Sequence, residues 1–171
     1  MPVTPLHMGP GALFKAAGGR HFSLTVFGFS QVLIDIEPLV RIIRGDAVLH
    51  GYSHTYVGAT LLAAVSVIAG RPICQWLLDH CWPESDLPFV RWLRGSKITL
   101  PAAIAGAFVG TWSHVFLDSL MHGDIEPLAP FSLANDVQLL ISIESLHLLC
   151  LLSGVAGLAG LYMVYRLQRE Y

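Results

Sequence analysis

GTWSHVFLDSLMHGD, residues 110–124, is the stretch that decides the fold. It closes an apolar run, residues 98–113, that contains no charged side chain and predicts a helix. Because a helix advances by about 100° per residue, His114, Asp118 and His122 drift slowly around one face. Two imidazoles and a carboxylate on one stripe supply half of a metal site, so we expect other segments to provide the remaining ligands.

The composition is typical of a membrane protein. Of the 171 residues, 54% are hydrophobic and 13% are charged, and the mean hydropathy is +0.60. Soluble domains carry about 25% charged residues, so most of this surface is not suited to water. We therefore predict an all-α, polytopic membrane helical bundle that has the lipid bilayer as its partner. The net charge of −2 and the lack of a basic stripe argue against a nucleic-acid partner.

Apolar segments and helix breakers predict a single integral membrane domain over residues 1–171, with four longer helices and a short N-terminal helical arm. The arm breaks at Gly18-Gly19, too early to cross a bilayer, which takes about 20 residues. Asn135 or Asp136 is expected to cap the last helix. The expected elements are a helical hairpin at 8–44, a helix at 53–71, an interfacial loop at 72–97, a helix at 98–121, a loop at 122–136 and a helix at 137–167.

Basic residues are distributed unevenly between the two sides of this bundle. With the turn at Gly18-Gly19 on the first side, that side carries eight of the ten Lys and Arg residues, and only Arg41 and Arg44 lie on the second. Cytoplasmic loops are enriched in Lys and Arg, so we expect the first side, with the C-terminus, to be cytoplasmic. The candidate site residues fall on the second side, although they were not used to choose the orientation.

Further segments bring ionisable side chains to this second side. His50 and His54 have the four-residue spacing of many zinc sites, although a loop histidine beside a helix-capping histidine has the same spacing. Asp35 and Glu37 interrupt an apolar segment, where carboxylates are costly and mark function unless they lie at the water interface. His7 reaches the same level if the N-terminal hairpin forms.

Glu144 and His147 form Glu-x-x-His inside the last predicted helix. This spacing presents two ligands inward in helical bundles, and it also fits a buried hydrogen-bonded pair that orders helix packing. We take both as ligands or as supports of the ligands, together with Asp124, which fits a plain turn-former equally well. Arg41 and Arg44, the only cations on this side, either anchor a helix end or bind a phosphate-bearing substrate.

The donor set predicts a divalent metal. Imidazoles and carboxylates without cysteine favour zinc, and admit manganese or iron, over copper(I). More than four candidates fit either two ions or one ion with an ordered outer layer of residues. In a hydrolase such an ion activates a water molecule, and Asp35 or Glu37 is the expected base that accepts the proton.

Five motifs follow one another in a fixed order: Pro5-Leu-His7, Ile34-Asp35-Ile-Glu37, His50-Gly-Tyr-Ser-His54, Ser113-His114-Val-Phe-Leu-Asp118 and Pro127-Leu-Ala-Pro130. In this order they resemble the family of LexA-binding, inner-membrane-associated hydrolases, also called membrane-bound metal-dependent hydrolases. The resemblance covers roughly residues 5–131 and implies a bacterial inner-membrane location and a hydrolytic reaction, without a substrate. Two motifs depart from the family pattern: Glu37-Pro38 replaces Asp-His, and the second histidine motif lacks its Arg and is one residue shorter. His122 is a substitute for the missing histidine.

Three functions remain open on these grounds. The first is a metal-dependent hydrolase with its site at the non-cytoplasmic end, acting on a lipid or another phosphoester near Arg41 and Arg44. The second is a non-catalytic membrane module with a structural metal, which would lack an open coordination position. The third is a transporter for protons or divalent metal ions. A transporter needs ionisable groups across the whole bilayer, whereas these crowd one end.

Overall fold

The chain forms helices joined by turns and loops. The computed structural model describes residues 4–81, 87–94 and 97–170, and this part of the chain contains no strand. The all-α prediction is confirmed for these residues. The elements in order are α1 (Thr4–Gly18), η1 (Gly19–His21), α2 (Leu24–Ile34), α3 (Ile36–Arg44), η2 (Tyr52–His54), α4 (Tyr56–Val65), η3 (Ser66–Gly70), α5 (Arg71–His80), α6 (Pro88–Arg94), α7 (Leu100–Met121) and α8 (Ile143–Glu170).

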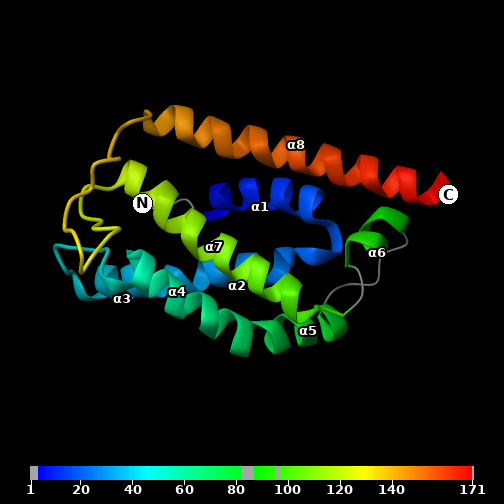
Figure 1. Cartoon of the computed structure of the whole chain (residues 1–171), viewed down its shortest axis with the longest axis horizontal. Coiled ribbons are helices and arrows are strands. Elements are labelled where there is room, and N and C mark those ends of the chain that lie inside the picture. The colour runs from blue at the N-terminus through cyan, green and yellow to red at the C-terminus, as the bar shows by residue number, and fades with distance from the viewer. Residues whose placement is uncertain (1–3, 82–86, 95–96, 171) are drawn as a thin grey trace.

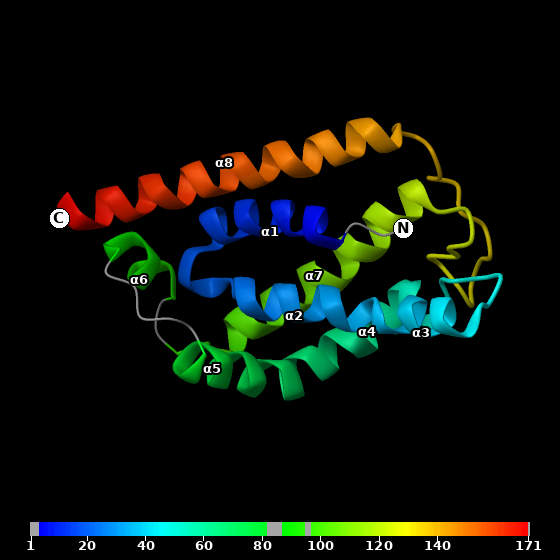
Figure 2. The ribbon, with the colours of Figure 1, turned by 180° about the vertical axis from the view of Figure 1, so that it is seen from behind.

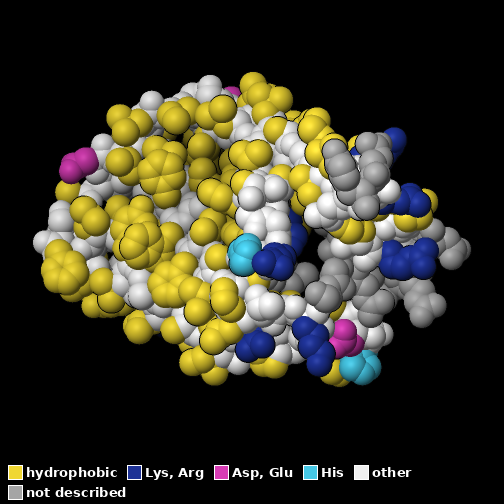
Figure 3. Space-filling model, turned by 45° about the vertical axis from the view of Figure 1, so that its right-hand side comes forward, with side chains coloured by type: hydrophobic (Ala, Val, Ile, Leu, Met, Phe, Trp, Pro, Cys, Tyr) yellow, Lys and Arg dark blue, Asp and Glu magenta, His cyan; other side chains and the backbone are white. Residues whose placement is uncertain are grey.

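Three helical stretches are long and apolar enough to cross a membrane. They are Tyr56–His80, which joins α4, η3 and α5, then Leu100–Met121, which is α7, and Ile143–Arg169 in α8. Hydrophobic side chains cover much of the surface in Figure 3, and Lys and Arg gather beside the α5–α6 end. The expected fourth longer helix is not continuous, because Asp35 separates α2 from α3.

Helix α7 lies at the centre of the molecule. Helices α2 and α4 pack against it, and α1 lies between α2 and α8 (Figures 1 and 2). Small residues allow α2 and α7 to approach closely: Ala103 and Ala107 are buried, and a side chain on Gly106 would collide with the Ser23 carbonyl. The two helices run in the same direction, so their C-terminal ends meet at one end of the molecule. The candidate site lies at that end.

The second expected helix differs in extent from its prediction over 53–71. It begins at Tyr56 and continues past Pro72 to His80. Within it, the N–H of Arg71 donates to the Ser66 carbonyl across a wide π turn, and Pro72, which has no N–H, follows directly. The first part of the expected interfacial loop is therefore helical, and α6 lies in its later part, beside residues 82–86 and 95–96, which fall outside the described residues.

Both ends of the chain also depart from the predicted boundaries. Helix α1 already begins at Thr4, and α8 begins only at Ile143. Asn135 does not cap α8; its Nδ2 donates to the carbonyls of Ser119 and His122, which ties the loop to the end of α7. The loop after α7 is therefore longer than the predicted 122–136.

Candidate metal centre

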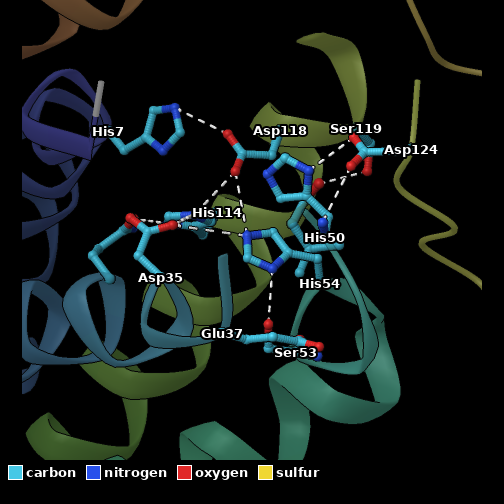
Figure 4. A network of polar contacts seen from close by, with 12 residues as sticks. His7, Asp35, Glu37, His50, Ser53, His54, His114, Asp118, Ser119 and Asp124 are labelled. Atoms are coloured by element: carbon cyan, nitrogen blue, oxygen red, sulfur yellow. Dashed lines mark hydrogen bonds and ion pairs between the residues drawn. The ribbon is translucent and has the colours of Figure 1, made fainter. Parts of the chain in front are cut away.

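Side chains from three segments meet where α2 and α7 end (Figure 4). Asp35 lies between α2 and α3, His54 ends η2, and His114 and Asp118 lie one turn apart on α7. One ligand atom from each of these residues lies within 4.8 Å of those of the others. The two histidines and Asp118 are fully buried. We call Asp35, His54, His114 and Asp118 the four-residue group.

Distances in the four-residue group are compatible with a cation shared by its members. His114 Nε2 lies 3.1 Å from Asp35 Oδ1 and 3.1 Å from Asp118 Oδ2. His54 Nε2 lies 3.4 Å from the same Asp118 oxygen. Ligand atoms held about 2.0 Å from a tetrahedral zinc ion lie roughly 3.3 Å apart. Neither Nε2 atom has a hydrogen-bond partner among the described residues.

Gln31 fixes the tautomer of His114. Its Oε1 lies 2.6 Å from His114 Nδ1, and its Nε2 donates to the Gly110 carbonyl at 3.0 Å. Because Gly110 takes the amide N–H, the amide oxygen faces the imidazole, so Nδ1 carries the proton and donates it. Nε2 then faces the carboxylates of Asp35 and Asp118. With a neutral ring this contact is repulsive, and either a bound cation or a second proton on Nε2 makes it favourable.

A second set of residues shares Asp118 with the first. His50, Asp118 and His122 each offer a ligand atom within 4.8 Å of the others, and we call them the three-residue group. Asp124 Oδ1 lies 2.8 Å from His50 Nδ1, the outer contact that commonly orients a metal-binding histidine. The Nε2 atoms of His50 and His122 lack a hydrogen-bond partner in the described part of the chain. Asp118 is common to both groups and would contribute to both sites if two ions were bound.

Asp124, the hydrogen-bond partner of the His50 ring, is held in its ionised form. Burial raises the pKa of Asp124, but the hydrogen bonds from the His50 ring and from the backbone N–H groups of His50 and Leu49 outweigh it and lower the pKa to about 2. An ionised Asp124 accepts the proton on His50 Nδ1 and leaves Nε2 for a ligand role.

His54 is supported through Ser53 and Glu37. Ser53 Oγ lies 2.9 Å from His54 Nδ1, and the Ser53 N–H donates to Glu37 Oε2 at 2.8 Å. The other Glu37 oxygen lies 2.8 Å from Arg41 Nη2. Burial raises the pKa of Glu37, but these contacts with Ser53 and Arg41 outweigh it, and the pKa lies below its ordinary value. Glu37, one of the two carboxylates expected from the sequence as a base, lies outside both groups and binds the loop that carries His54.

His7 lies against the same cluster. Its Nε2 atom is 3.5 Å from Asp118 Oδ1, and its ring meets the His114 ring edge-on with centroids 4.9 Å apart. The N-terminal hairpin thus brings His7 to the level of Asp35, as the sequence predicts, although His7 belongs to neither group.

Four other predicted site residues lie outside both groups. Glu144 is exposed in the first turn of α8, and His147 follows it one turn later. Arg41 is held by Glu37, and Arg44 lies 3.7 Å from Asp46. The two arginines therefore lie near Glu37 and Ser53, which support His54, and outside both groups.

Sequence reasoning missed two residues that orient the histidines, Gln31 and Ser53. A signal existed for Gln31, because it lies four residues before Asp35 in an apolar segment and so shares its helix face. Ser53 carries no such signal beyond being next to His54.

No protein-family model, curated protein or solved structure matches this chain. The resemblance to the membrane-bound metal-dependent hydrolases therefore rests on the order of the sequence motifs.

Proposed function

We propose that this chain is a membrane-embedded, metal-dependent hydrolase. The observation that carries the proposal is the convergence of the four-residue group, in which two histidine Nε2 atoms lie 3.1–3.4 Å from carboxylate oxygens without hydrogen bonds to the described residues. Buried imidazoles and carboxylates without a thiolate fit zinc best, and manganese or iron next. Because Asp118 belongs to both groups, the centre accommodates one or two ions.

The residues divide into holding and reacting roles. His54, His114 and Asp118 hold the ion, and Gln31 and Ser53 orient the two imidazoles. A divalent ion in this place supplies Lewis acidity, lowers the pKa of water and polarises a phosphoryl oxygen. The Asp35 side chain is 16% exposed, whereas Asp118 and His114 are 0% exposed, so the centre opens on the Asp35 side. Asp35 is thus the carboxylate placed to accept a proton from water.

The location proposed is the bacterial inner membrane, with the C-terminus in the cytoplasm. It is supported by the three apolar stretches and by the Lys and Arg residues at the end opposite the metal centre. The centre then lies at the outer leaflet, where a lipid or another phosphoester is the proposed substrate class.

Elemental analysis of detergent-purified protein tests the metal centre. We expect about one or two divalent ions per chain in the wild type and marked loss in His54→Ala and Asp118→Ala. The matched controls are His80→Ala and Asp79→Ala, which remove the same side chains from exposed positions on α5. Equal metal content in all five proteins would refute the metal centre.

A structural metal is the second candidate, favoured by the complete burial of the three residues proposed to hold the ion. Hydrolysis of a chromogenic phosphodiester by the metal-loaded protein separates the two. The enzyme is supported if the wild type hydrolyses the substrate and Asp35→Asn keeps its metal but loses this activity. The structural module is supported if the metal-loaded wild type hydrolyses neither this substrate nor phospholipid. Transport is less well supported, because the buried histidine and carboxylate side chains of the described residues, His7, His50, His54, His114 and Asp118, all lie at one end.

A further inference from the structure

A groove of about 560 Å³ lies next to the metal centre, where α3 meets α2 and α4. Its apolar wall comes from all three helices, and its polar end comes from α3 and the loop that follows. The apolar wall includes Leu33, Ile36, Val40 and Leu62, and the polar end includes Arg41 and Arg44.

The apolar wall is continuous with the surface proposed to face lipid. Leu62 belongs to the stretch Tyr56–His80, which is apolar enough to cross a membrane, and its neighbour Leu61 is 63% exposed. Ile36 and Val40 lie one turn apart on α3 and are about half exposed. Contact with acyl chains is favourable for exposed apolar side chains of this kind, whereas contact with water is unfavourable.

The two arginines at the polar end differ in how they are used. Arg41 is fixed by two bonds to Glu37, at 2.8 and 3.1 Å. Arg44 is 70% exposed and reaches Asp46 only at 3.7 Å, too far for a hydrogen bond. Glu37 and Asp46 line the same end, so the formal charges there balance. The exposed guanidinium of Arg44 is therefore the group that is available to bind a phosphate.

We infer that this groove binds a phospholipid of the bilayer, with its phosphate at Arg44 and Arg41 and one acyl chain along Leu33, Val40 and Leu62. The inference rests on the proposed membrane location and deepens the proposed function, because it makes a phospholipid the substrate class. Ile36, which lines the groove, directly follows Asp35 in the chain. Glu37 and Ser53, which also line it, connect it to His54.

Lipid binding to the detergent-purified protein tests this inference. The probes are phosphatidylglycerol and a diacylglycerol with the same acyl chains, followed by native mass spectrometry. We expect the wild type to retain phosphatidylglycerol about tenfold better, the scale of one charge-assisted hydrogen bond. Arg44→Gln should abolish this preference, and Val40→Trp should weaken retention of both lipids by filling the groove. Excess inorganic phosphate should not displace the phospholipid.

Two controls change the same chemistry elsewhere. Arg20→Gln removes an exposed guanidinium at the opposite end, and Leu61→Trp enlarges an exposed side chain outside the groove. Both should bind as the wild type does. Equal losses in Arg44→Gln and Arg20→Gln, or in Val40→Trp and Leu61→Trp, would overturn the inference. Displacement by inorganic phosphate would overturn it as well, since the groove would then select free phosphate.

The same assay in Asp118→Ala separates this inference from the metal centre. Phospholipid retention by the groove does not require the ion, so it should persist when the metal is lost. If the wild type has its full metal content but does not prefer phosphatidylglycerol to diacylglycerol, the groove inference alone is refuted. Absence of metal in a wild type that still selects phospholipid refutes the hydrolase alone.

Discussion

The two halves of α7 differ in the polarity of the side chains that they bury. The first half buries only small residues, Ala102, Ala103, Gly106 and Ala107, whereas the second half buries Val115, Leu117 and Leu120 together with the polar Thr111, His114, Asp118 and Ser119. Both halves pack against α2, so the difference does not come from a different neighbour. Close packing of α2 against α7 accounts for the small residues in the first half.

Packing does not explain the second half. Burying a charge without a partner costs several kcal/mol, and even a paired buried charge is rarely a net gain. Gln31 satisfies one nitrogen of His114, and Ser53 satisfies one nitrogen of His54. The remaining Nε2 atoms still face the Asp118 carboxylate. The second half of α7 therefore buries polar and charged groups that a shared cation would stabilise.

Asp118→Asn should give the largest loss of metal affinity among the variants of α7 and its neighbours. The substitution keeps the shape of the side chain and removes the charge that both groups share. We expect metal affinity to fall by more than about a hundredfold, since changes in residues that merely support ligands already cost about 10–100-fold. Competition with a zinc indicator measures it, and Asp79→Asn on α5 is the control. Wild-type affinity in Asp118→Asn would leave the buried carboxylate unexplained.

Removal of the metal should destabilise the wild type. An ion present at about 1,000 times its dissociation constant stabilises the folded state by about 4 kcal/mol. A chelator should therefore lower the thermal midpoint of the purified protein and leave the midpoint of Asp118→Asn unchanged. If both proteins respond alike, the chelator acts elsewhere and the second half of α7 is stable without an ion.

Gln31→Leu tests how far the orientation of His114 matters. Without the amide, neither tautomer is selected, and we expect metal affinity to fall by about 10–100-fold with the fold retained. The neighbouring Ser30→Ala is the control, since Ser30 is equally buried but its hydroxyl donates to the Phe27 carbonyl of its own helix. The same loss in both variants would indicate a general packing defect of α2.

The sequence predicts the part of the centre that depends on helical periodicity. His114 and Asp118 lie one turn apart on a helix that forms almost over its predicted range. His114 contacts Gln31 of α2, and Asp118 contacts His54 of η2. His122 continues the spacing but not the helix, because α7 ends at Met121 and His122 is extended. It reaches the three-residue group through the loop.

The roles of Asp35 and Glu37 depend on tertiary structure. Two residues apart in one apolar segment, they look equivalent in sequence. The break at Asp35 turns α3 away from α2, so Asp35 faces His114 while Glu37 faces Ser53. Glu144 shows the same limit: α8 begins at Ile143, later than its apolar pattern predicts, which leaves Glu144 exposed in the first turn.

Gly106→Ala should affect the packed half of α7 and spare the metal centre. The added methyl group meets the Ser23 carbonyl, and overpacking of this kind costs about 1–3 kcal/mol. We expect a lower thermal midpoint with unchanged metal affinity. Ile104→Ala, on the exposed face of the same helix, should cost less. A loss of metal in Gly106→Ala would show that the two halves are coupled.

Ser53→Ala should give the smallest effect, because it removes a single hydrogen bond to His54. One such bond contributes about 0.5–1.5 kcal/mol, so metal affinity should fall by about 2–10-fold. Ser113→Ala is a matched control: Ser113 also precedes a ligand histidine, but its hydroxyl donates to the Gly110 carbonyl of its own helix. His54 lies on the short η2, which is held by Glu37, whereas His114 lies on the long helix α7. A larger loss of metal affinity in Ser53→Ala than in Ser113→Ala would show that His54 depends on its loop and His114 on its helix. Equal affinities would mean that η2 holds His54 without Ser53.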